Sequence, residues 1–300
     1  MIVDCHSHIW SARSCLGQAE RFLCLGAAGD RPAQPEHHLA AAPPAQTSFV
    51  LGFVSRHLQA EIPNQFISNY VTGHAHRLVS FAGVDPTDRD AADQVRRLRE
   101  GQGFAGFTVS PACQAVHPCD TRLMRLYEIA QEVGMPVYFL HGVALPSEAH
   151  LEYGQPVLLD EVARAFPRLR LVIAHLGHPW VEQTLALLAK HERVYADVAG
   201  LAGRPWLAYR SLALAYECGV IEKLLFASDF PNHTVKSAVE AIYNLNKITL
   251  DSVLPAVPRE YLRGIVERNS LELLGLEAAE PERAVEVRVP VAQARTFEKA

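Results

Sequence analysis

The chain has 300 residues, of which 49% are hydrophobic and 20% are charged, and its formal net charge is -5. This composition is typical of a folded globular protein and excludes extensive disorder. The net negative charge disfavours a surface that binds nucleic acid or anionic membranes. No apolar run approaches the ~20 residues that a membrane span needs. We therefore expect neither nucleic acid nor a membrane among the partners.

The cysteines give no sign of a disulfide framework. The six cysteines contain no CxxC pair, and the chain opens on a strand pattern rather than on a signal peptide. We therefore expect reduced thiols and a cytoplasmic location.

Two histidines end the first apolar segment, residues 1–10, with the sequence MIVDCHSHIW. Side chains on a strand alternate between its two faces, so His6 and His8 point the same way. Two imidazoles placed in this way can bind one metal ion. A single histidine is more often a hydrogen-bonded core residue, so the interpretation of this pair depends on the rest of the chain.

Residues 11–46 form a long connection rich in Ala, Pro, Gly and Cys. Connections of this length in a compact domain are usually functional or mobile, and we expect this one to form a lid or a pocket wall.

Apolar runs and amphipathic segments then alternate along the chain, with the periodicities of strands and helices. The predicted strands after the first are residues 47–55, 79–84, 104–109, 136–141, 169–175, 194–198 and 224–229. The predicted helices are residues 62–75, 89–101, 119–133, 158–166, 180–191, 206–218, 235–246 and 260–274.

Eight buried strands with helices between them predict an α/β fold, a (β/α)8 TIM barrel. We expect a single domain over residues 1–276, with a long loop after strand 1, and a C-terminal extension over residues 277–300, in which residues 285–289 alternate like an edge strand. A doubly wound open sheet is the rival, but the first strand is followed by no glycine-rich phosphate loop.

The active site of such a barrel lies at the C-terminal ends of its strands. Five groups that can bind a metal fall at these ends. They are His6 and His8 on the first strand, His141 on the fifth, His175 on the sixth and Asp229 on the eighth.

Six segments resemble, in order, the amidohydrolase superfamily and its amidohydrolase-related branch, which includes aminocarboxymuconate-semialdehyde decarboxylase. These segments are residues 4–10, 126–142, 166–180 (FPRLRLVIAHLGHPW), 194–200 (VYADVAG), 224–231 (LLFASDFP) and 265–276. The resemblance implies that His6, His8, His141 and Asp229 bind one divalent metal ion, with zinc as the expected ion. It also implies that His175 and Asp229 are the catalytic residues. Three imidazoles and a carboxylate independently suit zinc and leave a coordination position for water or substrate.

The sequence departs from the two-metal members of the superfamily. They commonly bridge their metals with a carboxylated lysine on the fourth strand, whereas this chain has no lysine before Lys190. We therefore predict a single metal. Thr108 stands where many relatives of this branch have a lysine. Cys113 is a weaker candidate for a bridging ligand, because a free cysteine is usually a small buried hydrophobe.

Four further residues are candidates for substrate contact: His178, Arg13, Arg56 and Arg204. Each arginine follows a predicted strand end, and an arginine is suited to bind a carboxylated substrate. We expect Asp4 to have a supporting or structural role, and Asp197 either reaches the barrel mouth or makes a structural hydrogen bond.

The first functional hypothesis is a metal-dependent hydrolase of a small-molecule amide, ester or lactone. The alternative is a non-oxidative decarboxylase of an aromatic or unsaturated carboxylic acid that uses the same metal site, and a metal-free lactonase is a third reading. A catalytically inactive binding subunit is disfavoured because all five groups are present together. The expected partners are a small-molecule substrate, such as a carboxylate, and a second copy of the chain in a homodimer.

Overall fold

The computed structural model describes residues 1–23, 32–101, 103–142 and 145–276. The predicted C-terminal extension, including the alternating residues 285–289, lies outside the described residues. Among the described residues, no helix is both long and apolar enough to cross a membrane.

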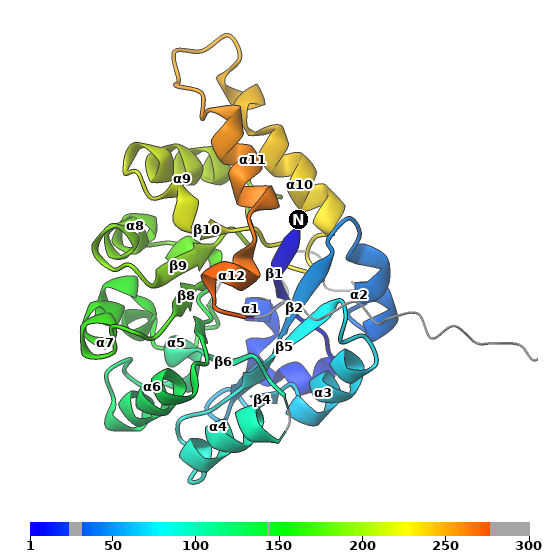
Figure 1. The fold of residues 1–300 in the computed structure, drawn as a ribbon, viewed down its shortest axis with the longest axis vertical. Coiled ribbons are helices and arrows are strands. Elements are labelled where there is room, and N and C mark those ends of the chain that lie inside the picture. The colour runs from blue at the N-terminus through cyan, green and yellow to red at the C-terminus, as the bar shows by residue number, and fades with distance from the viewer. Residues whose placement is uncertain (24–31, 102, 143–144, 277–300) are drawn as a thin grey trace, which may run out of the picture.

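Eight parallel strands form one central sheet, in which neighbouring strands follow the order of the chain (Figure 1). The strands are β1 (Val3–Ser7), β2 (Thr47–Leu51), β5 (Leu78–Gly83), β6 (Gly106–Val109), β7 (Val137–Phe139), β8 (Leu171–Ile173), β9 (Val194–Asp197) and β10 (Leu224–Leu225). The amide of Cys5 on β1 donates to the carbonyl of Phe226, just after β10, at 2.9 Å. This contact brings the first and last strands together, confirms the TIM barrel and excludes the open sheet.

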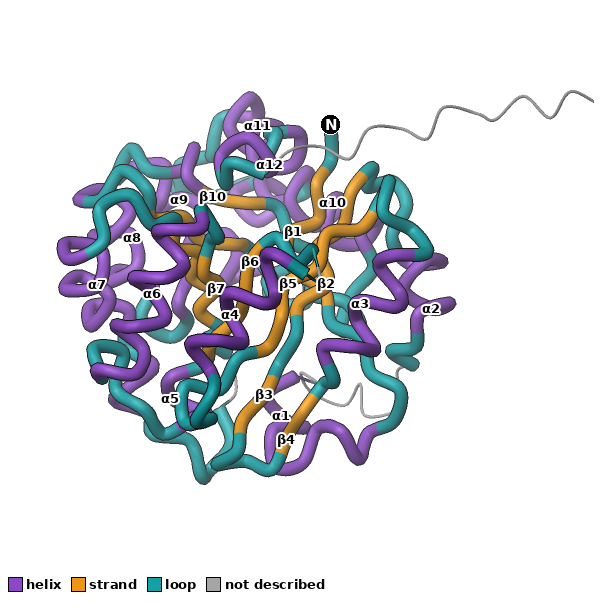
Figure 2. The backbone as a smooth tube through the Cα atoms, turned by 60° about the horizontal axis from the view of Figure 1, so that its bottom comes forward, coloured by secondary structure: helices purple, strands orange, loops and turns teal. Residues whose placement is uncertain are grey.

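Helices cover the outside of the strands, as the alternating pattern predicts (Figure 2). They are α3 (Asn64–Thr72), α4 (Ala91–Glu100), α5 (Pro111–Gln114), α6 (Thr121–Val133), α7 (Leu159–Ala165), α8 (Val181–Lys190), α9 (Pro205–Glu217), α10 (Val235–Tyr243), α11 (Arg259–Glu267) and α12 (Ser270–Leu273). Short 3-10 helices are η2 (Leu151–Gly154), η3 (Pro156–Leu158), η4 (Ala174–Gly177), η5 (Ile221–Lys223) and η6 (Leu245–Thr249).

Local sequence signals set the ends of α6. The side chain of Asp120 accepts a hydrogen bond from the amide of Arg122, which satisfies a free donor at the start of the helix. Gly134 ends the helix with a left-handed φ of 72°, a conformation that glycine adopts without steric cost.

The prediction of one apolar strand over residues 47–55 was wrong. β2 ends at Leu51, and residues Val54–Ser55 form β3, which pairs antiparallel with β4 (Ala60–Glu61). The break falls at Gly52, where a Cβ atom would lie 2.2 Å from the amide nitrogen of Gly83. Only glycine at position 52 allows these two backbone segments to approach this closely.

The prediction of one helix over residues 260–274 was also wrong. The backbone is extended at Arg268, with φ -68° and ψ 142°, so α11 and α12 are separate. The Arg268 guanidinium donates to the carbonyl of Leu224 at 3.2 Å, which ties this break to β10.

The connection over residues 11–46 is partly helical rather than a simple loop. It contains η1 (Arg13–Ala19), α1 (Glu20–Leu23) and α2 (Pro35–Ala41). The amide of Gln18 donates to the carbonyl of Leu58 at 2.9 Å, so η1 lies against the β3–β4 hairpin.

His38 anchors α2 to the barrel. Its side chain is 1% exposed, Nδ1 lies 2.7 Å from the Tyr70 hydroxyl, and its ring meets Phe230 edge to face with centroids 5.1 Å apart. Burial, together with the charge of Arg77, lowers the pKa of His38 from 6.5 to about 4. Folding therefore holds this imidazole neutral.

This burial predicts a pH-dependent loss of stability. Between pH 6.5 and about 4 the unfolded chain binds a proton at His38 and the folded chain does not, so stability falls as pH falls. The difference corresponds to about 3 kcal/mol. We expect His38→Gln to lose that much less stability than the wild type between pH 7 and pH 4, measured by urea unfolding at each pH. His37→Gln, at the exposed neighbouring position, is the control. Parallel pH profiles for wild type and His38→Gln would contradict the prediction.

Candidate metal centre

Five polar side chains converge where the strands end. All are at most 5% exposed, and they are His6 on β1, His8 just after β1, His141 just after β7, His175 in η4 after β8, and Asp229 after β10. They line one cavity of about 10 Å³, together with Leu23 of α1 and Leu140. The connection after β1 therefore contributes Leu23 as a wall of this cavity. A space of this size holds about one water-sized group.

The tightest group in the described chain consists of His6, His175 and Asp229. Each offers one ligand atom, and these atoms all lie within 4.8 Å of one another. This group contains His175, which the sequence assigned to catalysis. His8 and His141 complete the ring of side chains around the same cavity.

Hydrogen bonds at Nδ1 fix the orientation of the first two histidines. Nδ1 of His8 lies 2.8 Å from the carbonyl oxygen of Leu51, which can only accept, so this nitrogen carries the proton. Nδ1 of His6 lies 2.7 Å from Oδ2 of Asp197. In the neutral rings both Nε2 atoms are therefore unprotonated, and they lie 3.2 Å apart. Two facing lone pairs repel each other, and a cation bound by both relieves that repulsion, so this pair fits a metal ion.

The other two histidines also have free nitrogens. Nε2 of His141 and Nδ1 of His175 are buried and have no hydrogen-bond partner among the described residues. A buried polar atom without a partner is costly unless a ligand satisfies it. Burial lowers the pKa of His141 to about 4 and that of His175 to about 3. Both rings are therefore neutral at pH 7, the form that binds metals.

Asp229 stands in a left-handed backbone conformation, with φ 66°. Its amide donates to the carbonyl of His6 at 3.0 Å, and its Oδ2 accepts from the side-chain amide of Asn232 at 3.2 Å. Burial raises the pKa of Asp229 to about 7. Near neutral pH this carboxyl can therefore both accept and donate a proton.

Asp4 holds the segment just before Asp229. Its carboxylate accepts from the amide of Ser228 at 2.7 Å and from the Ser228 hydroxyl at 2.6 Å. The amide of Phe230 in turn donates to the Ser228 hydroxyl at 3.2 Å. Asp4 thus supports the backbone around Asp229, and burial raises its pKa to about 6.

Asp197 is a residue whose role the sequence left open. It is fully buried on β9 and accepts hydrogen bonds from Nδ1 of His6, the Tyr138 hydroxyl and the amides of His175 and Ala199. Burial opposes its charge, but the neighbouring His6 outweighs burial and the pKa falls to about 2. Its position at the end of a predicted strand was the signal in the sequence that it could reach the site. Its hydrogen-bond partners on other strands were not predictable from the sequence.

Two of the four candidates for substrate contact lie near the centre. His178 and Arg204 are both half-buried, and Nη1 of Arg204 donates to the carbonyl of Gly200 at 2.9 Å. Burial is the main cause of the pKa shifts of His175, His178 and Asp229, and the positive charge of Arg204 also lowers all three. Of the three candidate arginines, Arg204 is therefore the one whose positive charge acts on groups that line the cavity, His175 and Asp229.

Arg13 and Arg56 lie instead in exposed ion pairs. Arg13 contacts Glu20 at 2.8 Å, and Arg56 contacts Glu61 at 2.8 Å and Asp88 at 2.9 Å. Neither lines the cavity, and both guanidinium groups already have carboxylate partners.

Thr108 and Cys113, the candidate bridging ligand, both serve the fold. The Thr108 hydroxyl donates to the carbonyl of Gly52 at 2.7 Å and so links β6 to the end of β2. Cys113 is fully buried, and burial raises the pKa of its thiol to about 12. A thiol with that pKa stays protonated and is a poor metal ligand.

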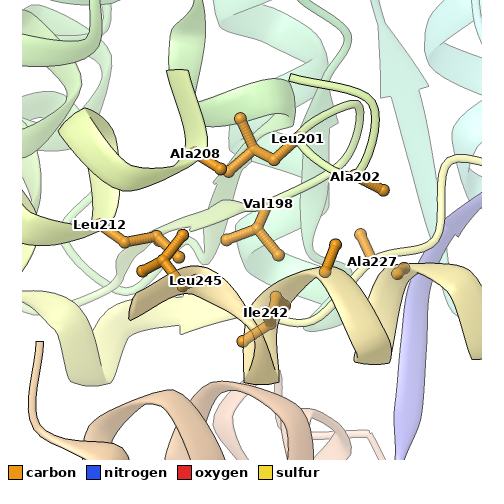
Figure 3. Close-up of a pocket in the computed structure, with 10 residues that line it drawn as sticks. Val198, Leu201, Ala202, Ala208, Leu212, Ala227, Ile242 and Leu245 are labelled. Atoms are coloured by element: carbon orange, nitrogen blue, oxygen red, sulfur yellow. The ribbon is translucent and has the colours of Figure 1, made fainter. Parts of the chain in front are cut away.

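A second cavity of about 10 Å³ lies between α9 and α10 (Figure 3). Its walls are apolar side chains such as Val198, Leu212 and Ile242. It offers no group that binds a metal or transfers a proton, so the polar cavity at the strand ends is the candidate site.

The fold and the site define a class of protein: TIM barrels with buried histidines and an aspartate at the ends of their strands. The family model described as amidohydrolase matches residues 3–276, and the chain belongs to this family. No curated protein sequence matches the chain.

Solved structures share the fold at low sequence identity. A probable 2-pyrone-4,6-dicarboxylic acid hydrolase from Acinetobacter baumannii, with citric acid bound, is 18% identical with a TM-score of 0.65, over 92% of this chain and 99% of that chain. A dihydroxybenzoic acid decarboxylase from a Polaromonas species, with bound manganese and 2-nitroresorcinol, is 16% identical with a TM-score of 0.66, over 91% and 96%. A 5-carboxyvanillate decarboxylase from Sphingomonas paucimobilis is 13% identical with a TM-score of 0.64, over 92% and 99%.

Proposed function

We propose that this protein is a metal-dependent hydrolase of a small-molecule amide, ester or lactone, with one divalent cation held by His6, His8, His141 and Asp229. The observation that carries the proposal is the approach of the Nε2 atoms of His6 and His8 to 3.2 Å in the cavity that Asp229 lines. We propose zinc, because imidazole nitrogens make up three of the four ligands. Manganese, present in the Polaromonas decarboxylase, is the alternative ion.

A divalent cation in this site would supply Lewis acidity that polarises a substrate carbonyl and lowers the pKa of water. Asp229 would take the proton of the attacking water as its oxygen bonds to the carbonyl carbon. When the C–N or C–O bond breaks, the same carboxyl would pass that proton to the leaving atom. His175, neutral because burial lowers its pKa to about 3, would orient the substrate oxygen through a hydrogen bond.

Decarboxylation of an aromatic or unsaturated carboxylic acid is the second candidate. In the absence of a bound cation the pKa of Asp229 is about 7, so a fraction of the carboxyl is protonated at neutral pH, as this reaction requires. That proton would pass to the substrate carbon as its bond to the carboxylate breaks and carbon dioxide leaves. We place hydrolysis first because a cation bound by Asp229 would favour its carboxylate form, which accepts the proton of water.

The absence of a bridging lysine predicts one metal ion per chain. We expect the purified protein to contain about one equivalent of zinc by mass spectrometry. His8→Ala should lose most of it, because a ligand is removed. His150→Ala, at an exposed position, is the matched control and should keep it. Two tightly bound ions would refute the single-metal site, and a metal-free protein after zinc loading would refute the metal site itself.

Asp229→Asn removes the proposed proton carrier while keeping its size. We expect a loss in kcat of about 10²- to 10⁴-fold, the contribution typical of general acid–base groups. The assay uses lactones, amides and hydroxybenzoates, and follows acid release and carbon dioxide release separately. Acid release supports hydrolysis, whereas carbon dioxide release establishes the second candidate.

Asp93→Asn, on the exposed face of α4, is the control for this substitution. Wild-type turnover by Asp229→Asn would refute both mechanisms. Activity that survives removal of the metal by a chelator would instead support the metal-free lactonase.

The field of Arg204 predicts a preference for carboxylated substrates. An ionic hydrogen bond contributes about 1.5 to 3 kcal/mol, so Arg204→Gln should raise KM for a carboxylated substrate by about tenfold or more. KM for a neutral analogue should change little. Arg13→Gln, in a surface ion pair, is the control. Equal effects of Arg204→Gln on both substrates would contradict a carboxylate contact.

A further inference from the structure

His6, a proposed metal ligand, and His175, proposed to orient the substrate, both form hydrogen bonds with the carboxylate of Asp197. His6 lies on β1 and His175 follows β8, and both bind Asp197 on β9. Oδ2 of Asp197 lies 2.7 Å from Nδ1 of His6 and 2.5 Å from the Tyr138 hydroxyl. Oδ1 accepts from the amide of His175 at 2.7 Å and from the amide of Ala199 at 3.0 Å.

We propose that Asp197 is the positioning residue of the site. In this proposal Oδ2 sets the tautomer of the proposed metal ligand His6, and Oδ1 holds the backbone that turns His175 toward the cavity. The inference rests on the proposed function, and it names the residue that arranges the metal ligands before any metal binds.

The first half follows from the chemistry of imidazole. A carboxylate only accepts, so Nδ1 of His6 must donate to Asp197, and Nε2 of the neutral ring is left with its lone pair. That lone pair lies 3.2 Å from Nε2 of His8, which the Leu51 carbonyl leaves unprotonated in the same way. Asp197 and Leu51 therefore maintain the facing pair of nitrogens that fits a cation.

The second half follows from the backbone. His175 and Leu176 have φ angles of 53° and 52°, in the left-handed region that is uncommon for residues other than glycine and least suited to a bulky residue such as Leu176. Such a conformation persists only where the surroundings hold it. The bond from the amide of His175 to Oδ1 of Asp197 is a charge-assisted bond in a fully buried site.

The carboxylate itself is held rigidly. An ionised carboxylate offers about four acceptor positions, and Asp197 uses four, two on each oxygen. Rotation about its side-chain bonds would break several of these bonds together. Asp197 can therefore transmit a fixed orientation to both histidines.

The test is Asp197→Asn, which reverses the two contacts of Oδ2, with His6 and with the Tyr138 hydroxyl, and keeps the two contacts of Oδ1. The oxygen of the amide must face the amides of His175 and Ala199, because both are donors, so its NH2 group faces His6. Nδ1 of His6 then becomes the acceptor, and its proton moves to Nε2, where His8 can accept it. We expect nitrogen-15 NMR of the metal-free protein, at a pH where His6 is neutral, to show His6 protonated at Nδ1 in the wild type and at Nε2 in this variant. The His6 signals are assigned by their loss in His6→Gln.

Zinc affinity, measured by titration with zinc alone, should fall about 10- to 100-fold in Asp197→Asn. Tyr138→Phe is the matched control, because it removes the other donor to Oδ2 without reversing the contact with His6, and it should change affinity less than about threefold. Crystal structures test the proposed hold of Asp197 on the His175 backbone. They should show the positive φ of His175 unchanged in Asp197→Asn and lost in Asp197→Ala.

Three results would overturn the proposal or one of its halves. The first is metal-free wild type with neutral His6 protonated at Nε2 and not at Nδ1. The second is Asp197→Asn with wild-type tautomer and zinc affinity. The third is a positive φ retained at His175 in Asp197→Ala, which would overturn the second half. If the wild type binds no zinc but the tautomer still switches, the proposed metal centre fails and the role of Asp197 is supported.

Discussion

The closure of the barrel between β1 and β10 is the constraint on which the site depends. Its hydrogen bonds join the beginning of the chain to a segment more than two hundred residues later, and one of them runs from the amide of Asp229 to the carbonyl of His6 at 3.0 Å. The two proposed ligands from opposite ends of the chain are therefore neighbours because the sheet closes. A fold that left β1 and β10 as free edges would separate them.

Burial of the site has a cost that its supporting hydrogen bonds offset. Desolvation holds His141 and His175 neutral, with pKa values of about 4 and 3, and raises the pKa of Asp229 to about 7. Asp197 and Asp4 accept hydrogen bonds from the same segments, so the polar groups beneath the cavity are paired. Among the histidines that line the cavity, His141 and His175 have a buried nitrogen without a hydrogen-bond partner in the described part of the chain, and a ligand would bind there.

Much of the fold and part of the site were predictable from the sequence. Eight apolar runs gave the strand count, and residue position at strand ends selected the five side chains that line the cavity. The breaks at Gly52 and Arg268 were missed, because each depends on a contact with another strand, at Gly83 and Leu224. For the same reason the sequence offered three arginines as equals, whereas ion pairs with residues of other segments set Arg56 apart from Arg204.

The two proposed reactions use the same carboxyl group in opposite protonation states. Hydrolysis requires Asp229 to begin as a carboxylate that accepts a proton from water, and decarboxylation requires it to begin protonated. Burial raises the pKa of this carboxyl to about 7 in the absence of a metal, and both forms are then present at neutral pH. A divalent cation bound by Asp229 would shift the balance toward the carboxylate, because an opposite charge favours the ionised form. The proposed metal ligand would then begin as the base that hydrolysis needs, and this is the physical reason for preferring hydrolysis.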